Sequence, residues 1–181
     1  YIDGREIDVG LLGNNPPEVL PPAEILFGES GPKIYTYEDK TKRSGREIEV
    51  ACPAAIDEEL AREAQSLALR TFQALGCYDC ARVDMRLDAQ GNLYILEVNS
   101  LPSLGEHGSY VAAAESVGLD FTQLINRLVE VAAARYFGTP TPPPVTARAA
   151  DAETQVFSYL TERRDRIERR VQKWTEISIR T

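Results

Sequence analysis

The feature that most constrains the fold is the stretch ARVDMRLDAQGNLYILEVNS, from Ala81 to Ser100. Apolar and polar residues alternate in ARVDMRLD, and DAQGN then separates this run from LYILEVN. This is the pattern of two β-strands joined by a turn. The turn is predicted to contain two residues, Gln90–Gly91, or four, Ala89–Asn92.

Either turn length gives the same pairing of the polar residues across the hairpin. Asp84 lies directly opposite Glu97, and Arg82 lies opposite Asn99. Like charges that face one another weaken a sheet. We therefore expect a positive group between the two acids.

Length and composition limit the class of protein. The 181 residues, of which 43% are hydrophobic and 27% charged, can bury the core of one globular domain with an appendage. The net charge of -8 argues against a nucleic-acid partner. No apolar run has the length of a membrane span and no secretion leader is evident, so we expect a cytoplasmic protein that does not enter the membrane.

The three cysteines, Cys52, Cys77 and Cys80, do not form the pattern of a secreted disulfide protein. The C-x-x-C motif follows a predicted helix, whereas a redox motif normally opens one. Buried thiols are favoured over a zinc site, which would have to recruit Cys52 and the single histidine, His107.

The remaining elements predict an α+β fold, in which an antiparallel β-sheet is flanked by helices. Before the hairpin we expect a strand in 4–14, an edge strand in 18–27 because of Pro21 and Pro22, a surface loop over 28–45 and a strand in 46–54. A helix capped by Asp57 and ending near Gly76 then follows. After the hairpin we expect a helix over Tyr110–Val117 and a helix capped by Asp120 and ending at Phe137.

The first domain is predicted to cover residues 1–137. A proline-rich linker follows over 138–152 and contains the sequence GTPTPPPVTARAAD. Residues 153–181 show an apolar stripe among arginines, which predicts an amphipathic helix and the possible start of a further module. Such a helix could mediate a homodimer or dock a partner.

The residue types on the hairpin indicate a metal site. Asp84, Glu97 and Asn99 offer only hard oxygen ligands, which suit Mg²⁺ or Mn²⁺ together with a nucleotide phosphate. Arg82 and Lys40 would then face the transferred phosphoryl group. Spacing alone favours another interpretation, a solvated strand face on which Arg82 and Arg86 neutralise the acids.

Five segments together resemble one enzyme family. From residue 1 to about 137, the chain is similar to the C-terminal half of the ATP-grasp domain of D-alanine–D-alanine ligases. The similar segments, in order, are GREIDVGLLGN, IYTYEDK, ACPA, LGCYDCARVDMRLDAQGNLYILEVNSLPS and GLDFTQLINRLVEVA. The resemblance implies ATP-dependent peptide-bond formation through an acyl phosphate, and a role in peptidoglycan and cell-wall biogenesis.

The resemblance also implies roles at the metal and phosphate site. Asp84, Glu97 and Asn99 match the magnesium ligands of the family, with Glu97 bridging two ions. Arg82 matches the arginine that steadies the developing phosphate and the tetrahedral oxyanion. Lys40 matches a lysine that reaches the terminal phosphates.

Three further positions match residues at the nucleotide. Tyr35 matches a neighbour of the lysine in the same loop, Glu6 the acid that holds the ribose hydroxyls, and Ile2 the hinge residue beside adenine. The alternatives remain open: Glu6 as an outward strand acid, Tyr35 and Lys40 as ordinary surface residues, and Ile2 as core.

The sequence departs from the family where the second amino acid binds. Ser103 replaces a glycine whose N–H donates to the oxyanion, and Gly108 replaces the serine that grips the substrate carboxylate, with Ser109 next to it. His107 matches a common histidine of this loop, and Thr41 replaces an aromatic residue. The identity of the second amino acid is therefore left open.

The resemblance implies that residue 1 follows directly on the family's adenine-binding residues, and we expect the other ATP-grasp lobe and the amino-acid-binding domain to be missing from this chain. We expect that this N-terminal lobe is its partner, and that the isolated chain is inactive. A different class of function is also considered, a non-catalytic module that docks a partner through its C-terminal helix.

Overall fold

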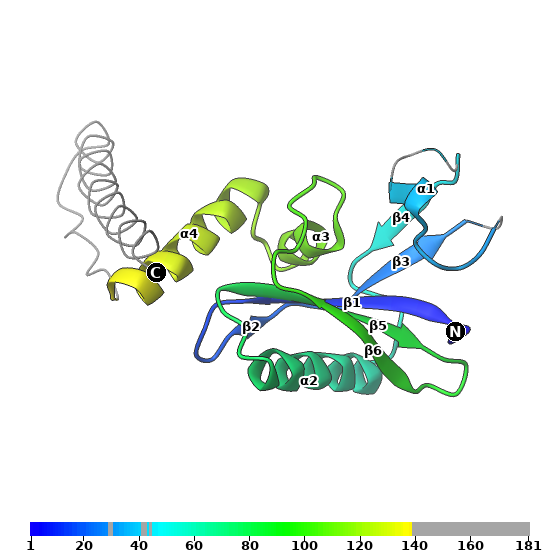
Figure 1. The fold of residues 1–181 in the computed structure, drawn as a ribbon, viewed down its shortest axis with the longest axis horizontal. Helices are drawn as coiled ribbons and strands as arrows, with labels where there is room; N and C mark the ends of the chain where they lie inside the picture. Colours follow the sequence, from blue (N-terminus) through cyan, green and yellow to red (C-terminus); the bar gives the residue numbers. More distant parts are fainter. Residues whose placement is uncertain (29–30, 41–42, 44, 139–181) are drawn as a thin grey trace, which may run out of the picture. The chain divides into compact units, whose positions relative to one another are not determined.

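A computed structural model describes residues 1–28, 31–40, 43 and 45–138 of the chain. Its centre is an open antiparallel sheet in the order β4-β3-β1-β5-β6, with the short β2 paired to β1 (Figure 1). The antiparallel sheet with flanking helices confirms the predicted fold class. The strands are β1 (Arg5–Leu12), β2 (Glu18–Val19), β3 (Ala23–Phe27), β4 (Ile48–Ala51), β5 (Cys80–Leu87) and β6 (Leu93–Asn99). The helices are α1 (Tyr37–Lys40), α2 (Glu58–Ala74), α3 (Ser109–Ser116) and α4 (Phe121–Phe137).

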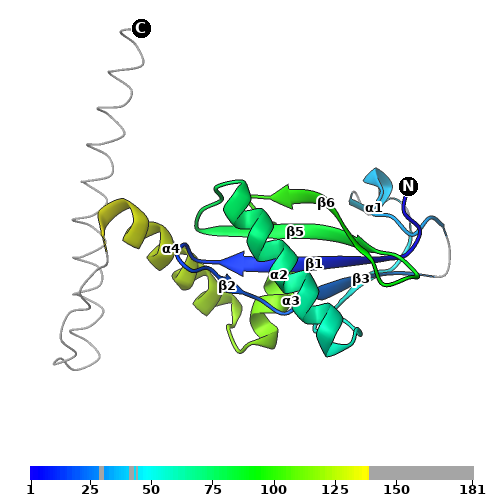
Figure 2. The same cartoon turned by 90° about the horizontal axis from the view of Figure 1, so that it is seen from below.

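Helix α2 covers one face of the sheet, as Figure 2 shows from below. The carboxylate of Asp57 caps the helix by accepting from the backbone N–H of Leu60 at 2.8 Å, as the sequence predicted. Alternate residues of β1 and β5 point toward α2 and form the main core with it. The buried members of this core are Val9, Leu11, Ala64, Ala68, Phe72, Ala81, Val83 and Met85.

Helix α3 lies on the opposite face of the sheet, above β1 in Figure 1. Tyr110 is fully buried there, and its hydroxyl donates to the carbonyl of Leu11 at 3.0 Å. The ring packs directly over Gly10, where an added Cβ would lie 2.9 Å from Tyr110 Cδ2. Glycine at position 10 thus lets α3 approach the strand, and this brings the start of α3 close to the polar residues of β1.

The hairpin formed by β5 and β6 has the predicted pairing but not the predicted turn. Asp84 pairs with Glu97 and Arg82 with Asn99, as expected. The turn is longer than either predicted length and covers Asp88–Asn92, held by hydrogen bonds to the Asp88 carboxylate. The pairing survives because a β-bulge leaves Leu96 without a partner, which offsets the extra turn residue.

Two sequence expectations between β1 and α2 are wrong. Residues 18–27 form two strands, and β3 is an inner strand between β1 and β4, because Pro21 and Pro22 precede it and remove none of its hydrogen bonds. The expected surface loop 28–45 contains α1, where Thr36 and Asp39 exchange hydrogen bonds at the start of the helix.

The two C-terminal helices of the first domain agree with the sequence. Helix α3 lies within one residue of the prediction, and α4 begins after Asp120 with a capping box that includes Gln123. The predicted linker from 139 onward and the arginine-rich helix lie outside the described residues. No helix within 1–28, 31–40, 43 and 45–138 is long and apolar enough to cross a membrane.

The close approach of Tyr110 to Gly10 generates a stability prediction. Gly10→Ala places a methyl group where the buried ring cannot give way, so the free energy of unfolding should fall by about 1–3 kcal/mol. Urea unfolding followed by circular dichroism measures this change. The matched control is Gly28→Ala, an exposed site where the nearest neighbour is 3.4 Å away, and a loss as large there would refute the packing argument.

Candidate functional site

Three carboxylates form a row across the polar face of the sheet. Asp8 on β1 pairs with Asp84 on β5, and Asp84 pairs with Glu97 on β6. Directly paired residues of neighbouring strands point to the same face. The sheet therefore carries three adjacent acids on the face opposite α2.

Arg82 provides the positive charge in this row. Its Nε and Nη2 donate to the two oxygens of Asp84 at 2.6 and 2.7 Å, and Nε lies 3.3 Å from Oδ2 of Asp8. Burial works against the charge of Arg82, but the hydrogen bonds to Asp84 and the charges of Asp8 and Glu97 outweigh it and raise the pKa of the guanidinium. Arg82 is therefore a fixed, permanent cation.

Asn99 joins the two acids of the hairpin. Its Nδ2 donates to Oδ2 of Asp84 at 2.8 Å and to Oε1 of Glu97 at 3.1 Å. The structure thus brings Asp84, Glu97 and Asn99 together on one face beside Arg82, as the cross-strand pairing predicted. The group between the two acids is here the amide of Asn99.

Asp8 is the residue that sequence reasoning missed. It is 3% exposed, its Oδ2 accepts from the hydroxyl of Ser109 at 2.6 Å, and its Oδ1 has no hydrogen-bond partner among the described residues. Burial, and next the charge of Asp84, raise the pKa of Asp8 to about 7. The sequence showed an acid on a half-buried strand, but no local signal reveals which distant strand will pair with it.

The donor set fits a hard divalent cation. One atom, Nδ2 of Asn99, lies within 3.1 Å of both hairpin carboxylates, so a single ion in that region can contact both. All available donors are oxygens if the amide of Asn99 turns, and Mg²⁺ or Mn²⁺ fills its shell with water and phosphate. In the described ranges no group of three or more Asp, Glu, His or Cys side chains is spaced to hold a metal, so Asp8 is not a third ligand in this arrangement.

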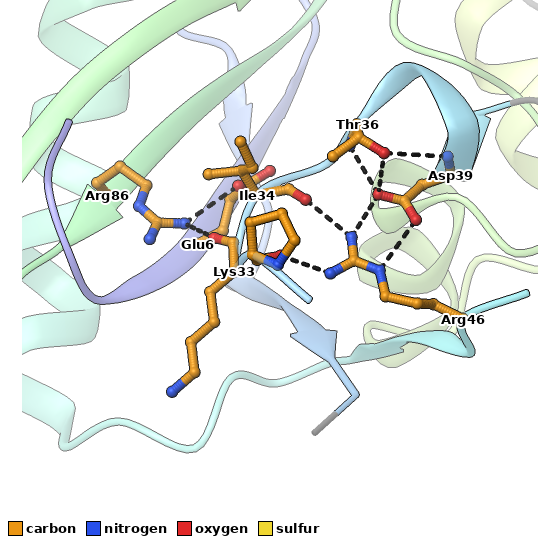
Figure 3. A network of polar contacts seen from close by, with 8 residues as sticks. Glu6, Lys33, Ile34, Thr36, Asp39, Arg46 and Arg86 are labelled. Carbon is orange, nitrogen blue, oxygen red and sulfur yellow. Dashed lines mark hydrogen bonds and ion pairs between the residues drawn. The ribbon is translucent and has the colours of Figure 1, made fainter. Parts of the chain in front are cut away.

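Arg86 connects the two residues predicted to contact the nucleoside, as Figure 3 shows for Glu6. Its guanidinium donates to Glu6 Oε2 at 3.3 Å, to the carbonyl of Ile2 at 3.2 Å and to the carbonyl of Lys33 at 2.8 Å. Arg86 therefore does not neutralise Glu97, as one interpretation of the sequence supposed. Burial raises the pKa of Glu6, although the charge of Arg86 opposes this.

Arg46 organises the loop that carries Tyr35 and Lys40 (Figure 3). It forms an ion pair with the buried Asp39 and donates to the carbonyl of Ile34 at 3.0 Å. Tyr35 is 43% exposed, and Lys40 is the last residue of α1. The nucleotide roles of Tyr35 and Lys40 stay predictions.

The loop before α3 and the first residue of that helix contain the residues predicted to bind the second substrate. Ser103 is exposed, and its Oγ accepts from the N–H of Gly105 at 3.2 Å. Gly108 caps α3 without a side-chain bond, and an added Cβ there would lie 3.1 Å from the carbonyl oxygen of Gly105. Ser109 is buried with its hydroxyl turned to Asp8. The substrate roles of Ser103, Gly108 and Ser109 stay predictions.

The three cysteines are free and half-buried. Burial raises the pKa of the Cys52 and Cys80 thiols, so neither has the lowered pKa of a reactive thiol. The sequence interpretation of buried thiols holds only in part, since all three side chains are half-buried.

Comparison with known proteins places these features in one family. The family model described as the D-ala D-ala ligase C-terminus matches residues 1–130. The chain belongs to this family. A D-alanine–D-alanine ligase of Pelotomaculum thermopropionicum is 38% identical over 132 residues, which cover 73% of this chain and 40% of that enzyme. The uncharacterized protein y4sG of Sinorhizobium fredii is 45% identical over 138 residues, which cover 76% of this chain and 41% of that protein.

Solved structures of the family have the same fold. The VanG D-Ala:D-Ser ligase of Enterococcus faecalis superimposes with a TM-score of 0.59 at 28% identity, covering 72% of this chain and 37% of that enzyme. This chain thus spans about two fifths of the length of these D-ala D-ala ligase relatives.

The buried Asp8 generates a prediction for the pH dependence of stability. Because its pKa is raised to about 7, the folded state keeps a proton on Asp8 that the unfolded chain releases near pH 4. This contribution to stability is present at low pH and is lost as the pH rises toward 7. Asp8→Asn removes the titration, so the stability of the variant relative to the parent should increase between pH 4 and 7.

Urea unfolding at several pH values measures this difference. A difference in unfolding free energy between Asp8→Asn and the parent that stays constant from pH 4 to pH 8 would show that Asp8 titrates normally.

Proposed function

We propose that this chain supplies the metal- and phosphate-binding part of an ATP-dependent carboxylate–amine ligase that joins two amino acids. The observation that carries the proposal is the convergence of Asp84, Glu97 and Asn99 beside Arg82 on one face of the sheet. Membership of the D-ala D-ala ligase family supports the reaction class.

The proposed reaction has two steps. A carboxylate oxygen of the first amino acid attacks the γ-phosphorus of ATP, the bond to the bridging oxygen breaks, and ADP leaves. The amine nitrogen of the second amino acid then attacks the acyl carbon, phosphate leaves with the former carboxylate oxygen, and the nitrogen loses a proton. Both steps develop negative charge on oxygen, which fixed cationic donors stabilise.

Four residues of the polar face have roles in this reaction. Asp84, Glu97 and Asn99 would hold Mg²⁺ or Mn²⁺ through their side-chain oxygens. The bound ions would neutralise the phosphate oxygens during transfer. Arg82 points a permanent charge at the transferred phosphoryl group and at the oxyanion of the second step.

The nucleotide lies along the neighbouring part of the same face. Glu6 accepts from the ribose hydroxyls, and the backbone near Ile2 lies beside adenine. Arg86 supports both by its hydrogen bonds to Glu6 and to the Ile2 carbonyl. Lys40 and Tyr35 approach the phosphates from the loop that Arg46 organises.

The second amino acid is recognised by the loop before α3, through Ser103 and Gly108, while Ser109 at the start of α3 lies behind them with its hydroxyl on Asp8. Relatives differ in this substrate, since one is a D-Ala:D-Ser ligase and others are D-alanine–D-alanine ligases. Gly108 offers no hydroxyl to the carboxylate of the second amino acid, and the hydroxyl of Ser109 is already donated to Asp8, so the second substrate is not restricted to D-alanine. A role in peptidoglycan and cell-wall biogenesis follows if both substrates are D-amino acids.

The chain alone should bind Mg·ATP weakly and form no peptide bond. In an ATP-grasp enzyme the nucleotide lies between two lobes, and this chain spans about two fifths of its relatives. The alternative function, docking through the C-terminal helix, concerns residues 153–181, which the structure does not describe.

The test of the proposal is Glu97→Gln in a polypeptide that joins this chain to the remaining segments of a family ligase. The change keeps the shape of the side chain and removes the charge that would bind the ion. Turnover should fall by about 100-fold or more, corresponding to ~3 kcal/mol of transition-state stabilisation. Phosphate release with pairs of amino acids measures the effect.

The matched control is Glu63→Gln, which removes the same charge from the exposed surface of α2 on the opposite side of the sheet. It should leave turnover within about twofold, as expected of a surface substitution. A Glu97→Gln enzyme as active as this control would overturn the catalytic role of the site.

A further inference from the structure

Arg82 is shared unequally between two carboxylates. Both of its donors engage Asp84 at 2.6 and 2.7 Å, whereas Asp8 receives only a longer contact of 3.3 Å from Nε. Asp8 has no other cationic partner among the ion pairs of the described residues. The two acids face each other across β1 and β5, so the guanidinium can contact either one.

The proposed metal site is in conflict with this arrangement. Arg82 occupies both oxygens of Asp84, and Asn99 shares one of them. A divalent cation bound to Asp84 needs at least one of these oxygens and repels the guanidinium at short range. Metal binding and the present contact between Arg82 and Asp84 are therefore competing interactions.

Asp8 has free capacity to accept the guanidinium. Its Oδ1 is buried without a hydrogen-bond partner among the described residues, while Nε of Arg82 lies 3.3 Å from the other oxygen, Oδ2. Its Oδ2 is fixed by the hydroxyl of Ser109, so the carboxylate is already oriented. A buried acid with one oxygen fixed and one unpartnered is suited to receive a donor from a neighbour.

We propose that Asp8 is a positioning residue that takes over the guanidinium of Arg82 when a divalent cation binds to Asp84. The inference rests on the proposed function, since it requires the metal site. It also connects two parts of the site, because Ser109 at the start of α3 fixes the carboxylate that receives Arg82. The phosphate-facing arginine is thereby positioned relative to the loop that precedes α3.

The test is the affinity of the full chain for Mn²⁺ alone, measured by the electron paramagnetic resonance of free Mn²⁺ at pH 8. In Asp8→Asn the guanidinium stays on Asp84 and competes with the ion, so affinity should fall about fivefold, a size typical of coupled neighbouring side chains. In the background of Arg82→Gln the competitor is absent, and adding Asp8→Asn should then change affinity by less than about twofold.

Two further measurements keep the result specific. Glu115→Gln on α3 removes one acidic charge without touching the row, and it should leave Mn²⁺ affinity nearly unchanged. If Asp8→Asn does not fold, the side-chain Nε–H resonance of Arg82 in the parent chain replaces it. When Mg²⁺ is added, this resonance should shift because its acceptor changes from Asp84 to Asp8, and the proton should stay protected from exchange with water. An unchanged resonance at saturating Mg²⁺, or a loss of protection, would overturn the proposal.

The outcomes separate this inference from the proposed function. An equal loss of Mn²⁺ affinity on Asp8→Asn with and without Arg82 means that Asp8 acts directly on the ion, which overturns the transfer of Arg82 but keeps the metal site. A parent chain that binds no Mn²⁺, like its Asp84→Asn variant, overturns both.

Discussion

The antiparallel pairing of β1, β5 and β6 is the constraint on which the site depends. It sets Asp8, Asp84 and Glu97 side by side, although adjacent like charges oppose sheet formation. The pairing holds because the alternate residues of the same strands form the core with α2. A slip of one residue would expose that core, so apolar burial on one face maintains electrostatic strain on the other.

The strain is relieved by hydrogen bonds that leave the site incomplete. Arg82 and Asn99 satisfy Asp84, while Asp8 keeps one oxygen without a partner in the described structure. A polar face on which every hydrogen-bonding group already has a partner would offer no free group to a cation or a phosphate. The unequal sharing of Arg82 is thus consistent with a site that is prepared for a further charge.

The sequence predicted what depends on neighbouring residues and on the hairpin. The caps at Asp57 and Asp120 and the pairing of Asp84 with Glu97 all follow from local patterns. Asp8 was missed because its position depends on the pairing of β1 with β5, strands far apart in the chain, for which the sequence has no local signal. The roles of Glu6 and Ile2 in nucleotide binding come from the resemblance to a ligase family. Their positions in the fold do not by themselves indicate a nucleotide.

The unpaired Leu96 has a consequence for how this hairpin can vary. The extra residue in the turn shifts the strand register by one residue, and the bulge in β6 shifts it back. The pairing of Asp84 with Glu97 is therefore the same as it would be with a turn one residue shorter and no bulge. Deleting one residue from Asp88–Asn92 and losing the bulge together would restore the pairing of Asp84 with Glu97. The length of the turn and the position of the two acids are thus separate features of this hairpin, because the bulge lies between them.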